Sequence, residues 1–233
     1  MKSHSADTVL LSSGLDPSGA AGVSADIETI NQFGITPLPI ITTLTVQNTQ
    51  NVTFLEATNN SLIQAQFKSI KEDIDFKVVK IGLLGSSSQI KAISKLLINR
   101  TDLSIVLDPI IVSSSDNELS TDSMIEAMKN DLIPLCSLLT PNLSELSCLA
   151  PGLNEQSAVA SLKCPWVLVT TSDSSEVEIE HRLYHHSNLV NKFSYKKLMI
   201  KLEFKISTNF IYFDFKYFCQ ILIILVNRYD IDR

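Results

Sequence analysis

The sequence lacks a hydrophobic run long enough to cross a bilayer, since the longest apolar run near its end spans only Ile221 to Val226. The first residues, Met1 to Thr8, lack the apolar core of a secretory signal peptide. A positive net charge is lacking too, because the formal charge of the chain is −6. Nucleic acids and anionic lipids attract basic surfaces instead. We therefore expect a cytoplasmic protein with no nucleic-acid or membrane partner.

Closely spaced cysteines are also lacking. The chain has four cysteines, which form neither a CxxC pair nor a zinc-ligand pattern: Cys136, Cys148, Cys164 and Cys219. We expect them to be reduced and partly buried thiols. The segment HRLYHH, which begins at His181, has no carboxylate or cysteine at ligand spacing in our interpretation, so we predict no metal site there.

What the sequence does contain is a regular alternation of strand-like and helix-like segments. Its 233 residues suit one domain with a single core. Short connections between the segments are typical of a parallel sheet covered on both faces, which places the protein in the α/β class. We predict strands at Val9–Ser12, Pro39–Thr45, Val78–Leu84, Ile105–Asp108, Leu138–Thr140, Val167–Thr171 and, near the edge of the sheet, Glu178–Tyr184.

Apolar residues at helical spacing predict the intervening helices. Gly34 is expected to end the first helix in a left-handed conformation, and Thr121 to cap the start of the fourth. The predicted helical stripes are Val23–Ile30, Ile63–Ile74, Ile90–Leu97 and Met124–Leu132, followed by a short helix at Leu143–Leu149.

Glycine and polar residues follow five of the predicted strands. Ligands of open α/β sheets bind outside the carboxyl ends of the strands, so this placement indicates a small-molecule site. Strand ends also need turn residues in any protein, and placement alone leaves both interpretations open. The segments concerned are Ser13–Gly19, Gly82–Gly85, Asp108–Pro109, Thr140–Asn142 and Thr170–Thr171.

The first of these loops carries the most specific motif. SGLDPSGAAG, at Ser13–Gly22, is glycine-rich and opens a helix, so its amides can meet an anion or a ring. It is neither a GxGxxG fingerprint nor a P-loop with GK[ST]. Extended through SADIETINQFGITPLPIITTLTVQNT, it resembles the opening of the hydroxymethylpyrimidine phosphate kinases of thiamine biosynthesis, where SGxDPSGGAG is followed by QAD and by TAQNT or TVQDT.

This resemblance continues in order through most of the chain, as far as Leu198. It implies a ribokinase-like, three-layer α/β/α domain at residues 1–198 with a mainly parallel central sheet. The matching segments are VKIGLLGS (Val79–Ser86), VLDPII (Val106–Ile111), LIPLCSLLTPNLSEL (Leu132–Leu146), VLVTTS (Val167–Ser172) and HRLYHHSNLVNKFSYKKL (His181–Leu198).

The family resemblance also implies an activity. Such enzymes use ATP and Mg²⁺ to phosphorylate 4-amino-5-hydroxymethyl-2-methylpyrimidine and then its monophosphate. The implied partner is therefore a small aminopyrimidine, and a homodimer stays open. Pyridoxal kinase is the nearest alternative enzyme, but the joint presence of SGxDPSG, AD and VQNT favours the pyrimidine enzyme.

Five residues match the substrate site of the family. Asp26 and Gln47 match positions that bind the polar edge of the pyrimidine, Gly14 lies against the ring, and Leu83 and Ile110 form apolar walls. A carboxylate and an amide suit an aminopyrimidine, because one accepts from its amino group and the other donates to a ring nitrogen. From sequence alone, a solvated helix residue and a strand-end cap are the alternatives for the two polar residues.

Four further residues match the nucleotide and metal end of the family site. Asp108 and Glu145 match positions that organise Mg²⁺, while Asn142 and Thr170 match positions near the nucleotide phosphates. Magnesium takes oxygen ligands and usually keeps several waters, so indirect contacts are reasonable. Asn142 and Glu145 also fit a helix capping box, and the two roles can coexist.

The tail, Met199–Arg233, departs from the family. It contains no Gly, Ala or Pro but has five of the ten phenylalanines, and no glycine follows Gly152 anywhere in the chain. In the family, a segment like FSYKKL precedes a GSGC or GTGC loop that holds the transferred phosphate and carries the catalytic acid/base residue. We therefore assign no catalytic residue and expect the C-terminal part of the fold to be incomplete.

Our hypothesis for this tail, residues 199–233, is a reading-frame disruption near residue 198, and a sequence-determination error would give the same chain. The kinase activity is then expected to be impaired. A catalytically dead remnant of the family is the alternative.

Overall fold

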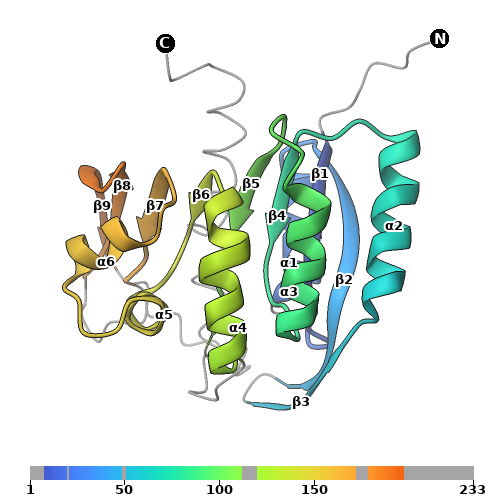
Figure 1. Ribbon diagram of the computed structural model, residues 1–233, viewed down its shortest axis with the longest axis horizontal. Helices are drawn as coiled ribbons and strands as arrows, with labels where there is room; N and C mark the ends of the chain where they lie inside the picture. Colours follow the sequence, from blue (N-terminus) through green and yellow to red (C-terminus); the bar gives the residue numbers. More distant parts are fainter. Residues whose placement is uncertain (1–7, 20, 49–50, 112–119, 172–177, 197–233) are drawn as a thin grey trace.

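The computed structural model describes residues 8–19, 21–48, 51–111, 120–171 and 178–196, which build one central sheet (Figure 1). Its strands are β1 (Thr8–Leu15), β2 (Thr36–Gln47), β3 (Val52–Ala57), β4 (Val78–Ile81), β5 (Ser104–Leu107), β6 (Leu138–Leu139), β7 (Trp166–Val169), β8 (Glu178–His185) and β9 (Asn188–Lys196). They are ordered β3-β2-β1-β4-β5-β6-β7-β8-β9. Every pair from β2 to β7 is parallel, whereas β3 and the β8–β9 hairpin pair antiparallel. The predicted, mainly parallel sheet is confirmed.

Helices cover this sheet on both faces. They are α1 (Gly22–Gln32), α2 (Asn60–Asp73), α3 (Ser87–Leu97), α4 (Asp122–Ala127), α5 (Leu143–Leu149) and α6 (Glu155–Ser161). Figure 1 shows α2, α3 and α4 side by side over one face, with α1 behind the sheet. No helix in the described part of the chain is long and apolar enough to cross a membrane.

The two faces follow from strand alternation, because successive side chains of a strand point to opposite sides. In β4, Val79 and Ile81 belong to the larger core, which α2 and α3 cover. Lys80 between them points the other way, toward Asp26 of α1. The predicted three-layer α/β/α arrangement is therefore confirmed within the described residues.

Most predicted elements occur, with some differences. The predicted bounds of α5 match those observed, and Gly34 ends α1 with φ +69° as expected. We did not predict β3, α6 or β9. The expected cap at Thr121 is wrong in detail: Thr121 occupies the N-cap position of α4, but its side chain makes no capping hydrogen bond. Its hydroxyl lies 3.0 Å from the Ser123 hydroxyl instead.

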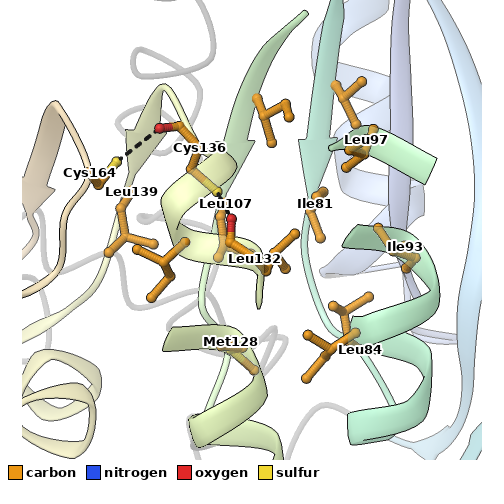
Figure 2. Packing of buried hydrophobic residues seen from close by; sticks show 14 of the residues in the cluster. Ile81, Leu84, Ile93, Leu97, Leu107, Met128, Leu132, Cys136, Leu139 and Cys164 are labelled. Carbon is orange, nitrogen blue, oxygen red and sulfur yellow. Dashed lines mark hydrogen bonds between the residues drawn. The ribbon is translucent and has the colours of Figure 1, made fainter. Parts of the chain in front are cut away.

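The cysteines behave as small buried side chains. Cys136 and Cys164 are buried, and neither they nor Cys148 forms a disulfide. Figure 2 shows the thiol of Cys164 donating to the Cys136 carbonyl oxygen, at 3.4 Å. Burial raises the pKa of Cys164 to about 12 and that of Cys136 well above its usual value, so both stay protonated. Cys219 and the whole tail at 199–233 lie outside the described residues.

His181 joins the end of β7 to β8. Its side chain is buried, and its Nδ1 accepts a hydrogen bond from the Thr171 amide at 3.1 Å. Burial, with the charge of Arg182 as the second cause, lowers the pKa of His181 from 6.5 to about 4. Between these two values the unfolded chain takes up a proton that the folded chain does not. His181 therefore makes its full contribution to the free energy of unfolding above about pH 6.5, and this contribution decreases as the pH falls toward 4.

We predict that this one group lowers the free energy of unfolding by about 2 kcal/mol between pH 7 and pH 5. His181→Asn keeps a hydrogen-bond acceptor but cannot take up the proton, so its pH dependence should be shallower by that amount. Urea unfolding at both pH values measures this. His186→Asn, in the β8–β9 turn at φ 44° where Asn is tolerated, is the matched histidine-to-asparagine variant that leaves the Thr171–His181 contact in place. Parallel slopes for His181→Asn and the parent would contradict the prediction.

Candidate active site

Most of the predicted site residues lie along one edge of the sheet, in an order set by the strands, whereas Asp26 lies on α1. Parallel strands share their carboxyl ends, so the residues that follow them meet at this edge. From β2 to β7 in sheet order, the segments at this edge contain Gln47, Gly14, Leu83, Asp108 with Ile110, Asn142 and Thr170. The residues predicted to bind substrate thus fall at the β2–β1–β4 end, except for Ile110 after β5, and those predicted for the nucleotide and Mg²⁺ at the β5–β6–β7 end.

Gly14 and Leu83 are in close contact at the β1–β4 boundary. A Cβ added to Gly14 would lie 3.0 Å from Leu83 Cδ2 and would collide with the Thr43 hydroxyl. A side chain at position 14 therefore has no room, so glycine is needed here for space. This agrees with the expectation that Gly14 and Leu83 lie on the same ligand, although the ligand contact itself stays a prediction.

Asp26 forms an ion pair that the sequence analysis did not predict. Lys80 Nζ donates to both carboxylate oxygens of Asp26, at 2.9 and 2.7 Å. Each of the two residues is only 5% exposed. Because the contact joins the middle of α1 to β4, it holds the helix that follows the first loop against the sheet.

Gln47 and Ile110 are held by other contacts. Thr45 Oγ1 donates to the Leu15 carbonyl oxygen at 3.0 Å and lies 3.2 Å from Gln47 Oε1, which ties the end of β2 to the end of β1. Ile110 is half-buried in the loop after β5, where its carbonyl oxygen accepts from Ser120 Oγ at 3.2 Å. That Asp26, Gln47 and Ile110 enclose one pocket stays a prediction.

The nucleotide end contains the predicted capping box. Asn142 Oδ1 accepts from the Glu145 amide at 2.7 Å, and Glu145 Oε2 accepts from the Asn142 amide at 2.9 Å. Asn142 also pairs with Thr170 in a parallel bridge, so these three residues lie together. Asp108 is buried at the end of β5, the strand next to β6. The structure thus places the four residues at adjacent strand ends.

The donor set at this end suits Mg²⁺ in chemistry but does not form a complete cage. Asp108 and Glu145 offer carboxylate oxygens, which Mg²⁺ prefers. In the part of the chain that the structure describes, no group of three His, Cys, Asp or Glu side chains could hold a metal ion. These residues therefore fit a Mg²⁺ that is held largely through waters and phosphate oxygens.

Several polar residues of this edge were missed by the sequence analysis. Lys80 is the clearest, since a lysine inside the apolar run VVKIGLL is a signal for a buried charge partner. Ser13 and Thr43 are fully buried, and their hydroxyl oxygens have no hydrogen-bond partner within the described structure. Gln89 of α3 was also missed; it accepts from the Gly85 amide at 2.8 Å and donates to the Thr42 and Thr58 carbonyl oxygens.

A sequence profile described as phosphomethylpyrimidine kinase matches residues 16–201 of this chain. The chain belongs to the phosphomethylpyrimidine kinase family. The resemblance found in the motifs is therefore confirmed, and the match ends close to Leu198.

Curated relatives of the phosphomethylpyrimidine kinase family agree with this assignment. The hydroxymethylpyrimidine/phosphomethylpyrimidine kinase of Aquifex aeolicus (strain VF5) is 38% identical over 136 residues, which cover 58% of this chain and 53% of the relative. The protein of the same name from Escherichia coli (strain K12) is 32% identical over 136 residues, 58% of this chain and 51% of the relative. The chain thus spans about half the length of the curated relatives it matches.

Solved structures confirm the ribokinase-like fold. The phosphomethylpyrimidine kinase of Clostridium difficile 630 has a TM-score of 0.69 and 28% identity, over 82% of this chain and 84% of that chain. The Staphylococcus aureus pyridoxal kinase in complex with AMP-PCP has a TM-score of 0.74 but 19% identity, over 86% of this chain and 76% of that chain. The second likeness concerns the fold alone.

We predict that Glu145 has two separable roles, as a helix cap and as a residue that binds Mg²⁺. Glu145→Ala removes the side chain that closes the capping box and should lower the free energy of unfolding by about 1 kcal/mol. Glu145→Gln keeps a capping-box side chain and should cost less than half of that. Chemical denaturation measures both values, and equal losses in the two variants would contradict the capping role.

The same pair of variants tests the charge. Glu145→Gln should fold but bind ATP more weakly when Mg²⁺ is present, with little change when Mg²⁺ is absent, because only the carboxylate charge has been removed. Calorimetric titration with and without Mg²⁺ gives this difference. Identical Mg²⁺ dependence in Glu145→Gln and the parent would leave Glu145 as a helix cap alone.

Proposed function

We propose that this chain has the substrate-binding architecture of a hydroxymethylpyrimidine/phosphomethylpyrimidine kinase of thiamine diphosphate biosynthesis. Its substrates are then 4-amino-5-hydroxymethyl-2-methylpyrimidine and the corresponding monophosphate, with ATP as the phosphoryl donor. The observation that supports this most is the meeting of the β1 and β4 ends, where Gly14 contacts Leu83, together with the buried carboxylate of Asp26 on α1, which is paired with Lys80 of β4.

The roles of these residues follow from their chemistry. The Asp26 carboxylate accepts a hydrogen bond from the exocyclic amino group, and the Gln47 amide donates to a ring nitrogen. Gly14 allows the ring to approach the backbone, while Leu83 and Ile110 exclude water from its faces. Together these contacts fix the hydroxymethyl oxygen in one orientation, which lowers the entropy cost of the transfer.

The nucleotide end supplies the phosphate contacts in this proposal. Asn142 and Thr170 would lie near the phosphates of ATP, and Asp108 and Glu145 would hold Mg²⁺ directly or by accepting from its waters. When bound, Mg²⁺ neutralises charge on the transferred phosphoryl group. The Asn142–Thr170 bridge keeps the ends of β6 and β7 in register for this purpose.

We infer that phosphoryl transfer itself is impaired in the chain of 233 residues. Transfer depends on donors aimed at the equatorial phosphoryl oxygens, which the family's GSGC loop provides. No glycine follows Gly152 in this sequence, so no GxGC segment is present. The family match that ends at residue 201 supports a change of sequence character near Leu198.

The pyridoxal kinases are the second candidate, because they share the fold at TM-scores above 0.7. At 19% and 23% identity, this likeness concerns the fold alone. Pyridoxal offers a phenolic oxygen and an aldehyde where the pyrimidine offers an amino group. A buried carboxylate suits the amino group, which has two N–H donors, better than the aldehyde, which only accepts, or the phenol, which has a single O–H donor.

We predict that the purified 233-residue chain has little or no kinase activity. Loss of a single oxyanion-hole donor costs roughly 10²–10³ in rate, and loss of general acid–base catalysis typically about 10²–10⁴. The two losses need not multiply, but the smaller one alone leaves the reaction marginal. Coupled detection of ADP release with hydroxymethylpyrimidine measures the rate.

A chimera is the matched comparison. Residues 1–198 joined to a C-terminal segment that carries the family's GSGC loop should be at least 10²-fold more active than the unmodified chain, the factor expected for one oxyanion-hole donor. The nucleotide sequence beyond codon 198 should also encode a GSGC-like segment in another frame. Family-like turnover by the unmodified chain would refute the impairment, and an inactive, well-folded chimera that binds no pyrimidine would refute the proposed substrate.

A further inference from the structure

The buried ion pair of Lys80 and Asp26 holds α1 against β4, but an apolar pair of side chains could hold it equally well. Lys80 lies on β4 between Val79 and Ile81, and its pairing with Asp26 takes two charges out of water. Such pairs often contribute no more to stability than a well-packed apolar pair of the same volume, because desolvation offsets the attraction. A role in ligand binding would explain why two charged side chains are buried at this place.

The space around the ion pair is kept open by a glycine. A Cβ at Gly82 would lie 3.1 Å from Lys80 Nζ and would collide with Ser13 Oγ. The backbone φ of Gly82 lies outside the left-handed region, so the glycine is needed here for space and not for conformation. Lys80 and Ser13 therefore converge on the place that a side chain at position 82 would fill.

The Ser13 hydroxyl at this place lacks a partner. Ser13 is 0% exposed, and its Oγ has no hydrogen bond within the described structure. Leaving a buried hydroxyl unsatisfied is unfavourable because the group has lost its hydrogen bonds to water, so native proteins rarely do so. A ligand group that pairs with this hydroxyl would recover the cost.

We propose that Lys80 and Ser13 complete the aminopyrimidine site: Lys80 as a positioning residue for the Asp26 carboxylate, and Ser13 as a direct hydrogen-bonding partner of the hydroxymethyl oxygen. The assignment rests on the proposed function. The proposal adds Lys80 and Ser13 to the residues carried over from the family and gives each of them a role. The motif resemblance assigns neither residue.

The position of Ser13 along the sheet supports its role. In the proposed substrate, the amino group lies between the ring nitrogen and the hydroxymethyl group. Gln47 lies on β2, and Ser13 lies on the neighbouring β1 beside the Lys80 head, on the side nearer to the nucleotide end. If Gln47 takes the ring nitrogen and Asp26 the amino group, the hydroxymethyl group points toward Ser13 and onward to the phosphoryl donor.

Lys80 acts through Asp26. Its ammonium contacts both carboxylate oxygens and so fixes the plane of the carboxylate. A carboxylate offers about four lone-pair sites, so this contact does not exhaust its accepting capacity. The carboxylate then meets the amino group in one preset orientation, which reduces the entropy cost of binding.

Calorimetric titration of the full 233-residue chain with three pyrimidines tests the roles. The ligands are 4-amino-5-hydroxymethyl-2-methylpyrimidine, its analogue with a 5-methyl group and its analogue without the amino group. Ser13→Ala should weaken the full ligand about fivefold and leave the 5-methyl analogue unchanged, as expected for one neutral hydrogen bond. Lys80→Met should weaken both amino-bearing ligands at least tenfold and spare the analogue without the amino group, whereas Lys80→Arg should restore part of the affinity.

The matched controls change a serine on β1 and a lysine just before β4. Ser12→Ala removes the neighbouring hydroxyl on β1, which faces the apolar core on the opposite side of the sheet, and should leave all three affinities unchanged. Lys77→Met removes a surface lysine just before β4, paired with Asp102. Thermal unfolding verifies that each variant is folded, and Ser13→Ala with Lys80→Arg carry the test if Lys80→Met does not fold.

The outcomes separate this inference from the proposed function. Parent binding with no ligand-specific loss in Ser13→Ala, or equal losses for all three ligands in the Lys80 variants, would overturn the inference and leave the function standing. Absence of binding of every pyrimidine to the folded parent would overturn the proposed function and this inference with it.

Discussion

The ion pair between Lys80 and Asp26 lies inside an otherwise apolar sheet, and the arrangement of the β1–β2–β4 end depends on it. Strand β4 is covered on both faces, so its side chains need apolar surroundings or a partner. Lys80 finds its partner in Asp26, and the contact fixes α1 against β4. Because α1 begins at Gly22, shortly after the SGLDPSG segment at Ser13–Gly19, the ion pair holds in place the helix that follows this loop. The absence of a side chain at Gly82 leaves space for the Lys80 ammonium group and the Ser13 hydroxyl.

Local signals in the sequence predicted the elements that local interactions define. The bounds of α5 could be predicted because the capping box of Asn142 and Glu145 is encoded within four residues. Strand β3 could not, because most of its residues are exposed and no buried–exposed alternation marks it. Helix α6 has only two buried residues, Ala158 and Val159, which is too few to give a helical stripe.

The contacts of the predicted site residues could not be derived from the sequence. Motif resemblance assigned roles to Asp26, Gln47 and the strand-end residues, and the topology places Gln47 and the strand-end residues along one edge of the sheet. The partner of Asp26 lies 54 positions away along the chain, so no local pattern connects the two residues. The unpartnered hydroxyls of Ser13 and Thr43 are likewise visible only after folding, since small hydroxyl residues are common at strand ends.

We propose that the β1–β2–β4 end of the sheet binds an aminopyrimidine whether or not the chain transfers phosphate. A crystal structure of the 233-residue chain with 4-amino-5-hydroxymethyl-2-methylpyrimidine is the decisive measurement. We predict the ring beside Gly14 and Leu83, with its amino group on the Asp26 carboxylate and the Lys80 ion pair retained. A ring bound elsewhere, or one at this edge with its amino group turned away from Asp26, would contradict it.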